Sequence, residues 1–264
     1  MLEIKKYAAI DIGSNAIRLL IANVIVEKDK EPQFRKSSLV RVPIRLGADT
    51  FISGEITSAN IHRMVDAMEA FKLLMKINNV EKYKACATSA MREAKNGKEV
   101  AKSIFEETGV EIEIIGGKKE AAIISSTDLN ELIESDSSYL YVDVGGGSTE
   151  FTIFSKGRII NSKSFKMGTV RLINNTKSEN KIIYKDVQNW VEANTKGLKK
   201  LSLIGSGGNI NKLFKMSGRT EGKPISYIYL NAQYQFLKNM SFEDRVSELS
   251  LNPDRADVII PATK

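Results

Sequence analysis

The sequence predicts an α/β protein made of two similar halves. Apolar segments with strand character alternate along the chain with segments whose apolar residues recur at helical spacing. The turn motif Asp-Ile-Gly in "YAAIDIGSNAIRLLIANV" returns as Asp-Val-Gly in "LYVDVGGGSTEFTIF". A chain of 264 residues with 42% hydrophobic content is long enough to bury a core in each half. We expect two domains, residues 1–124 and 125–264, joined within the polar stretch 125–138 and packed closely around a cleft.

In the first half, strands and turns lead into a long amphipathic helix over residues 57–79. We assign its apolar stripe to the core and its single histidine, His62, to the helix surface. A strand that leads into a loop follows over residues 83–94, and a helix over residues 97–109 ends at Gly109. A short strand then spans residues 110–115, and a loop that enters a helix spans residues 116–133.

The second half opens with a glycine hairpin over residues 139–154. Next come a helix over residues 185–201 and a strand, glycine loop and helix over residues 202–216. A helix with a serine N-cap begins at residue 241. This alternation of strands and helices is typical of the α/β class.

The formal charge of +7 and the pI of about 9.2 fit either a polyanionic partner or a solvated lysine-rich surface. No block of arginines and aromatic residues indicates single-stranded nucleic acid, so we expect no nucleic-acid partner. We expect no membrane partner either, because the sequence has neither an apolar run of roughly 20 residues nor an apolar leader, and we predict a cytoplasmic protein. With one cysteine (Cys86) and one histidine, a metal would need oxygen ligands.

The two matched turns have the chemistry of a phosphate site. Their backbone N–H groups, with the hydroxyls of Ser14, Ser148 and Thr149, are suited to bind phosphate oxygens. Asp11, Asp143 and Glu150 would repel those phosphates unless a divalent cation lay between them, and this conflict favours Mg²⁺. The alternative is that Asp and Gly here only form ordinary turns.

Three further features have both a functional and a structural interpretation. The loop "IGSGGNINKL", with Gly207 and Gly208, follows a strand and enters a helix, which is a common anion site, but it is neither a P-loop nor GxGxxG. Arg92 is placed to reach a phosphate or to form a surface salt bridge. Glu120 is placed either to orient a water molecule near phosphate or to complement a helix dipole.

Seven stretches of the chain, in order, resemble the Ppx/GppA phosphatases, which comprise exopolyphosphatases and guanosine pentaphosphate phosphohydrolases. They run from about residue 7 to residue 261: "AAIDIGSNAIRLLI", "ATSAMREA", "GGKKEAAI", "LYVDVGGGSTEF", "KMGTVRL", "IGSGGNINKL" and "NPDRADVIIP". Single stretches are shared with the wider actin and sugar-kinase superfamily, whereas the combination is specific. The resemblance implies two ribonuclease-H-like domains around an active-site cleft, dependence on Mg²⁺, and release of terminal phosphate by water.

The resemblance also implies roles for individual residues. Glu120 matches the catalytic base of the family, and Arg92 matches the arginine of the family's ATSA-x-R segment. The first phosphate motif supplies Asp11, Ser14, Asn15 and Arg18, and the second supplies Asp143, Gly145, Gly146, Gly147, Ser148, Thr149 and Glu150. Gly168 and Arg171 match a connecting segment near the phosphates, and Gly207 and Gly208 match the third glycine loop. We assign Asp11, Asp143 and Glu150 to the metal.

The function predicted from these residues is removal of terminal phosphate from inorganic polyphosphate, with guanosine pentaphosphate as a second substrate, by a homodimer. Two alternatives stay open: a kinase of the same superfamily, which would need an acceptor site and an adenosine pocket, and a non-catalytic sensor of polyphosphate or alarmones. The sequence departs from the family at "VIIPATK", where relatives usually continue with a further helix, and we expect a two-domain enzyme without the extra C-terminal domains of the long exopolyphosphatases.

Overall fold

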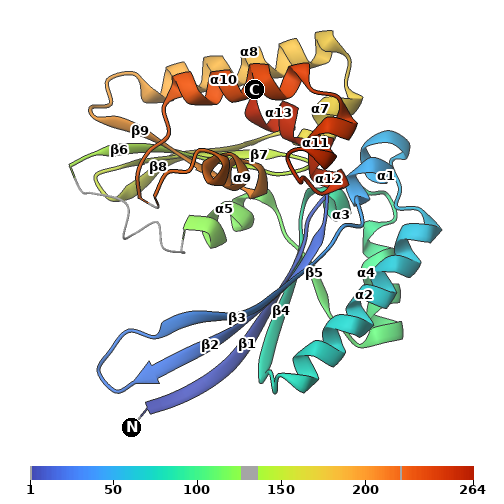
Figure 1. Ribbon diagram of the computed structural model, residues 1–264. Coiled ribbons are helices and arrows are strands. Elements are labelled where there is room, and N and C mark those ends of the chain that lie inside the picture. The colour runs from blue at the N-terminus through green and yellow to red at the C-terminus, as the bar shows by residue number, and fades with distance from the viewer. Residues whose placement is uncertain (1, 126–135, 221) are drawn as a thin grey trace. The chain divides into compact units, whose positions relative to one another are not determined.

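The computed structural model describes residues 2–125, 136–220 and 222–264, which form two compact units, Met1–Gly116 and Gly117–Lys264 (Figure 1). The units divide between residues 116 and 117 rather than between 124 and 125. The reason is that helix α5 (Gly117–Ser125) packs against β7 and β8 of the second unit. Most of the predicted joining stretch lies outside the described residues.

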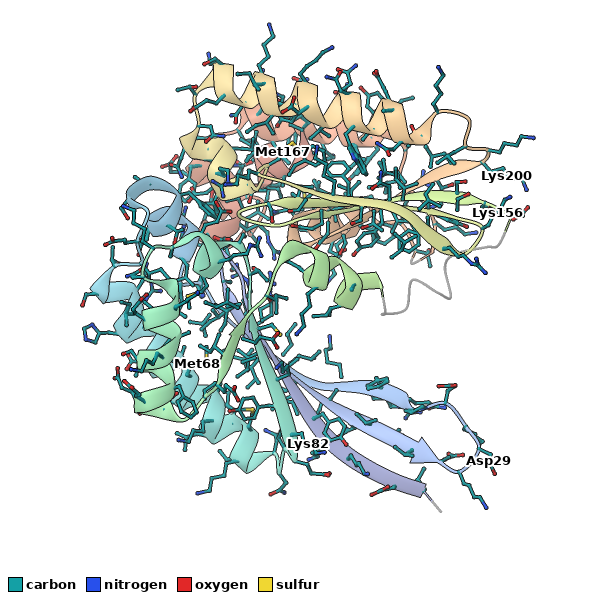
Figure 2. The ribbon with its side chains drawn as sticks, turned by 180° about the vertical axis from the view of Figure 1, so that it is seen from behind. Asp29, Met68, Lys82, Lys156, Met167 and Lys200 are labelled. Carbon is teal, nitrogen blue, oxygen red and sulfur yellow. The ribbon has the colours of Figure 1, made fainter. Side chains whose placement is uncertain are left out.

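The first unit is built on a five-stranded mixed sheet of order β3-β2-β1-β4-β5. Strands β1, β2 and β3 are antiparallel neighbours, whereas β4 is parallel to β1 and β5 is parallel to β4. Their bounds are Leu2–Ile12, Ile17–Glu27, Gln33–Val42, Lys82–Ala87 and Ile112–Ile114 for β1 to β5. The connection between β2 and β3 turns at Asp29, labelled in Figure 2, whose φ is 62°.

Helices α2 (Ser58–Ile77) and α4 (Gly97–Thr108) lie on the same side of this sheet (Figure 1). Alternate residues of the strands, such as Ile10 and Leu19, form one buried cluster with Met68, which is labelled in Figure 2, and other helix residues. Period-two burial in the strands and helical burial in α2 together place the core of the unit between the sheet and these helices.

The predicted helices over 57–79 and 97–109 are confirmed. The Thr57 side chain caps α2 by accepting a hydrogen bond from the backbone of Asn60, and Gly109 ends α4 with a φ of 72°. His62 lies exposed on α2, as predicted.

Two helices of this unit were not predicted. Residues after β4 form a short helix, α3 (Ser89–Glu93), where the sequence indicated a loop, and α1 (Leu46–Ser53) follows β3. The loop prediction was wrong because the backbone closes helical hydrogen bonds there, from Arg92 to Thr88 and from Ala94 to Ala90. Five residues are too few for apolar periodicity to reveal a helix.

The second unit repeats the strand arrangement of the first. Its sheet has the order β8-β7-β6-β9, with antiparallel β6, β7 and β8 and with β9 parallel to β6. The bounds of β6 to β9 are Ser138–Val144, Thr149–Ser155, Arg158–Phe165 and Leu201–Ser206. This arrangement matches β3-β2-β1-β4 strand for strand, so the repeat predicted from two turn motifs extends to the sheets. Each unit is therefore α/β and ribonuclease-H-like, as expected.

One face of the second sheet is covered by α8 (Lys177–Thr195), whose Trp190 forms edge-to-face contacts with Phe151 and Phe165. This helix begins and ends earlier than the predicted 185–201. A capping box of Thr176 and Glu179 starts it, and Gly197, with a φ of 84°, follows its end.

The remaining helices of the second unit pack around a separate apolar cluster that includes Leu213, Leu237 and Ile259. Their bounds are Thr169–Asn174 (α7), Gly208–Met216 (α9), Tyr227–Asn239 (α10), Phe242–Ser247 (α11), Pro253–Ala256 (α12) and Ile259–Thr263 (α13). The predicted serine cap is confirmed, because Ser241 accepts from the backbone of Asp244 at the start of α11. The buried guanidinium of Arg245 donates to backbone carbonyls of α10, its C-cap and α12, and so joins these helices.

Within the described ranges, none of the helices combines the length and the apolar character that crossing a bilayer would require.

Candidate phosphate-binding site

The turn between β6 and β7, residues 145–148, is tightly closed. The backbone N–H of Gly145 donates to the carbonyl of Ser148 at 3.0 Å. The equivalent turn of the first unit is closed in the same way, by Gly13 and Ala16 at 3.1 Å. A Cβ built on Gly145 would lie 3.0 Å from the Ser148 oxygen, so the close approach of the backbone explains the glycine.

The carbonyl groups of this glycine turn face the start of α7. The backbone N–H groups of Thr169 and Val170 donate to the carbonyls of Gly145 and Gly146 at 3.0 and 2.9 Å. The side chain of Arg171 donates through Nε to the carbonyl of Gly147 at 3.0 Å. The first turn of α7 therefore occupies one side of the glycine turn.

Gly168, the N-cap of α7, makes this packing sterically feasible. A Cβ on Gly168 would lie 2.2 Å from the carbonyl carbon of Gly147 and 2.3 Å from that of Gly146. No side chain fits at such distances, so glycine is required at this position. The predicted connecting segment thus contacts the predicted phosphate loop directly.

The orientation of the carbonyls fixes that of the N–H groups. The peptide bonds of the described residues are trans, and in a trans peptide the C=O and N–H bonds point in opposite directions. Since the carbonyls of residues 145, 146 and 147 point toward α7, the N–H groups of Gly146, Gly147 and Ser148 point away from it. Successive N–H groups on one side of a turn form a concave anion-binding nest.

Four residues form a row across the second sheet, just before the glycine turn. In register order from β8 to β9 they are Ser164, Glu150, Asp143 and Ser206. Glu150 is only 3% exposed, and its Oε1 accepts hydrogen bonds from the hydroxyls of Ser148 at 2.6 Å and Ser164 at 2.9 Å. These two donors satisfy part of a carboxylate that has lost most of its water. We refer to these four residues as the carboxylate row.

Tyr141 lies beside the carboxylate row, two residues before Asp143 on β6. Burial raises the pKa of the Tyr141 phenol, a hydrogen bond with Ser206 opposes the rise, and the charges of Asp143 and Glu150 add to it. The phenol is therefore neutral at physiological pH. Tyr141 was not identified from the sequence, and its spacing of two residues from Asp143 on one strand was the signal that could have found it. Ser206 gave no such signal, because its position follows from the register of β9 against β6.

The third glycine loop packs against Asp143. Gly207 has a φ of 116°, and a Cβ there would lie 2.9 Å from the carbonyl oxygen of Val144 and 3.6 Å from Oδ1 of Asp143. The next residue, Gly208, begins α9, and a Cβ on it would lie 3.3 Å from Nη2 of Arg255. The predicted Gly207 and Gly208 thus join the second phosphate motif, and a guanidinium lies near the start of α9.

Arg255 was not predicted as a site residue, although "NPDRADVIIP" was one of the matching stretches. Its position depends on α12 folding back toward α9 through the cluster of Leu213, Ala256 and Ile259. A lone arginine in a short helix gives no such signal in sequence. The only available clue was its place within a matching motif.

Glu120 lies in the first turn of α5, and its Oε2 atom is buried. The helix begins at Gly117 against β8, where a Cβ on Gly117 would lie 3.4 Å from the Cβ of Ser164. Ser164 in turn donates to Glu150. The predicted base is therefore on a helix whose start contacts the edge of the carboxylate row.

The predicted residues of the first unit have internal partners. Arg18 and Asp11 form an ion pair of 2.7 Å across the β1–β2 hairpin. The hydroxyl of Ser14 is 2.9 Å from that of Ser89, at the start of α3, and Arg92 on the same helix donates to the carbonyl of Ile115 at 2.7 Å. Asn15 lies in the turn, and its backbone carbonyl accepts a hydrogen bond from the backbone N–H of Arg45 at 3.0 Å. These residues gather at the ends of β1 and β4, and their substrate contacts stay predictions.

The hydroxyl of Thr149 also has an internal acceptor, since it donates to the carbonyl of Met167 at 2.6 Å. Met167, labelled in Figure 2, directly precedes Gly168. Thr149 therefore holds the segment that leads into α7, and its predicted contact with phosphate stays a prediction.

Across the residues that the structure describes, no group of three or more histidine, cysteine, aspartate or glutamate side chains is arranged to hold a metal ion. The neighbouring carboxylates of Asp143 and Glu150 nevertheless fit Mg²⁺, which commonly takes one or two carboxylates and completes its coordination with phosphate oxygens and water. Asp11, the third predicted ligand, is paired with Arg18.

Comparison with known proteins gives a family match over most of the chain. The model of the Ppx/GppA phosphatase family matches residues 24–263. A bifunctional 3-dehydroquinate synthase/phosphatase of Fusobacterium nucleatum is 34% identical over 288 residues, which cover 97% of this chain and 42% of the relative. Exopolyphosphatase 2 of Mycobacterium tuberculosis is 29% identical over 65% of this chain and 54% of its own length. The chain thus spans about half the length of these curated relatives.

Among solved structures, an exopolyphosphatase from Cytophaga hutchinsonii has a similar fold. It superimposes with a TM-score of 0.82 over 98% of this chain and 88% of its own, at 23% identity.

Proposed function

Because the chain belongs to the Ppx/GppA phosphatase family, we propose that it is a phosphohydrolase that releases terminal phosphate from inorganic polyphosphate, with guanosine pentaphosphate as a second substrate. The observation that carries this proposal is the glycine turn 145–148, whose N–H groups point away from α7 beside two carboxylates. The name of the Mycobacterium tuberculosis relative, an exopolyphosphatase, points to the same substrate class.

In this proposal the N–H groups of Gly146, Gly147 and Ser148 bind the oxygens of the terminal phosphate. Asp143 and Glu150 would hold Mg²⁺, which when bound neutralises charge on the phosphate oxygens. This arrangement resolves the electrostatic conflict between the carboxylate row and a polyanion. Arg255, on α12, has its guanidinium near the start of α9 and adds positive charge on the side of Asp143.

Glu120 is the proposed base. It orients a water molecule and accepts a proton from it as the water oxygen attacks the terminal phosphorus. The bond between that phosphorus and the bridging oxygen breaks, and the shortened chain leaves with the bond electrons. The products are inorganic phosphate and a polyphosphate chain that is shorter by one phosphate unit.

A phosphate-release assay with Mg²⁺ tests the proposal, with long polyphosphate, guanosine pentaphosphate and ATP supplied separately. We expect release from polyphosphate and poor release from ATP. ATP turnover that required an added sugar or acid would instead identify a kinase. Tight binding of polyphosphate without release of phosphate would identify a sensor.

The positive net charge gives a second test of the substrate class. A long polyphosphate makes many charge contacts at once, so its binding should weaken steeply with added salt, while binding of a short nucleotide should weaken less. Equal salt dependence for both would assign the excess charge to ordinary solvated surface.

A cytoplasmic location and a homodimeric state are further proposals, which come from the sequence. Light scattering of the purified chain tests the dimer, and fractionation of cells that express a tagged chain tests the location.

A further inference from the structure

Ser164 lies at the outer end of the carboxylate row, on β8, outside every motif that the sequence analysis identified. Its hydroxyl donates to Oε1 of Glu150 at 2.9 Å, and the hydroxyl of Ser148 donates to the same oxygen at 2.6 Å. Ser148 belongs to the glycine turn itself, whereas Ser164 belongs to the neighbouring strand. The second donor therefore ties Glu150 to the neighbouring strand β8 as well as to the turn.

Burial makes these two hydrogen bonds important. Glu150 is almost inaccessible to water, so its carboxylate depends on protein donors, and hydrogen bonds to a buried charge are stronger than those between neutral groups. Two hydroxyls that converge on one oxygen also restrict rotation of the carboxylate, because rotation would break both bonds. The orientation of Glu150 is therefore set in part by Ser164.

Ser164 also contacts the start of α5, since a Cβ on Gly117 would lie 3.4 Å from its own Cβ. The serine thus contacts both Glu150 and the start of the helix that carries Glu120. We propose that Ser164 is a positioning residue, which holds the Glu150 carboxylate in one orientation and against which the start of α5 packs. The consequences of this role for the kinetics of phosphate release rest on the function proposed above.

The chain offers a matched control on the same strand. Ser162 precedes Ser164 by two residues and therefore lies on the same face of β8, and its hydroxyl bonds the hydroxyl of Thr152 at 3.0 Å. Ser162→Ala and Ser164→Ala each remove one hydroxyl from this face. Only the second removes a donor to a carboxylate of the proposed site.

The kinetic experiment measures phosphate release from polyphosphate as a function of Mg²⁺ and of substrate. We expect Ser164→Ala to raise the Mg²⁺ concentration for half-maximal activity by about 10- to 100-fold, as for other residues that orient a metal ligand. KM for polyphosphate at saturating Mg²⁺ should change much less, and Ser162→Ala should leave both quantities near those of the parent. Equal effects of the two variants would overturn the proposal.

A second experiment needs no turnover. In a double-mutant cycle on melting temperature, Ser164→Ala should lower the melting temperature of the parent by several degrees, yet have no effect in a Glu150→Leu background. Ser162→Ala should have the same effect in both backgrounds. If Glu150→Leu does not fold, Glu150→Gln replaces it, and the effect of Ser164→Ala should shrink because a neutral amide oxygen accepts more weakly.

An unchanged effect of Ser164→Ala in the Glu150 variant would overturn the positioning role. The cycle remains decisive even if the parent protein releases no phosphate from any substrate. That result would overturn the proposed function alone.

Discussion

Asp143 and Glu150 are direct cross-strand partners on β6 and β7, one pair before the last pair of the hairpin. The same position in the first unit holds Asp11 and Arg18, which form an ion pair of 2.7 Å. The two hairpins thus have the same strand pairing, but the first carries two opposite charges at this position and the second carries two negative charges. Like charges directly opposite each other destabilise a hairpin, whereas a bound cation would turn this repulsion into attraction.

Replacing Asp143 with alanine should therefore raise the Mg²⁺ concentration needed for activity, or abolish activity. Replacing it with asparagine should have the same direction of effect, because an amide binds Mg²⁺ more weakly than a carboxylate. Phosphate release measured over a range of Mg²⁺ concentrations checks this. If Asp143 only shapes the turn, the asparagine variant will retain the metal dependence of the parent.

Glu120→Gln keeps the size of the side chain and removes its ability to accept a proton. Turnover should fall by about 100- to 10,000-fold, while polyphosphate affinity should survive or rise slightly because one negative charge has gone. Steady-state kinetics together with a direct binding assay separate the two quantities. Near-normal turnover would exclude Glu120 as the base and leave Asp143 and Glu150 as the candidates.

Arg92→Ala is the contrasting variant for this experiment. Its guanidinium donates to the carbonyl of Ile115, which holds it at the end of the first sheet. If the same guanidinium contacts phosphate, affinity for polyphosphate should fall, in the direction opposite to that expected for Glu120→Gln. Because the variant also removes the bond to Ile115, its melting temperature should be measured alongside. Unchanged affinity would assign Arg92 a structural role only.

Gly168→Ala should displace the glycine turn, because its Cβ would lie within 2.3 Å of backbone atoms of Gly146 and Gly147. We expect a loss of stability of about 2 kcal/mol or more and a loss of phosphate binding. Denaturant unfolding and a phosphate-binding assay measure the two effects. Gly116→Ala is the steric control for the unfolding measurement, since a Cβ there would meet no atom within 4 Å. Equal unfolding midpoints for the two variants would contradict the packing described.

The carboxylate of Asp49 on α1 should stabilise the folded state more at pH values above the pKa of Asp49 than at pH values below it. Burial raises the pKa of Asp49, but hydrogen bonds from the side chain and backbone of Thr57 and from Asn60 outweigh burial, and the net pKa lies below its ordinary value. A folded-state pKa below that of the unfolded chain stabilises the protein above the unfolded value, and this stability is lost as the pH falls through the folded value.

The urea midpoint of Asp49→Asn should accordingly lie below that of the parent at pH 7, and the difference should shrink as the pH drops below about 4. Asp66→Asn, at an exposed position on α2, serves as the control. A difference between Asp49→Asn and the parent that stays constant from pH 7 to strongly acidic pH would contradict the assigned hydrogen bonds.

The sequence was informative wherever a local pattern carried the information. The stripe of α2, the glycine end of α4 and the serine cap of α11 each depend on residues a few positions apart, and each was predicted. The repeated Asp-x-Gly turns predicted a duplication that the strand order of the two sheets extends. Short helices such as α3 were missed because five residues do not show a period.

Register, rather than local pattern, decides the rest of the candidate site. Ser164 and Ser206 join the acidic residues only because β8 aligns with β7, and β9 with β6, in one particular register, and no separation along the chain encodes that alignment. Arg255 depends on a helix that returns from a distant part of the chain. Sequence motifs therefore identified the backbone turns and their acids, and they missed the side chains that other strands and helices bring to them.

The packing of the glycine turn on α7 has a consequence for local unfolding. The amide hydrogens of Thr169 and Val170 are bonded to the carbonyls of Gly145 and Gly146, so the turn cannot move away from the start of the helix without breaking these bonds. These amides should therefore exchange with solvent deuterium together, at a rate set by one shared opening event. Bound phosphate would slow the exchange of amides that it never touches, on the far side of the turn. Exchange at the first two amides of α7 thus reports whether the turn is occupied, without any enzymatic assay.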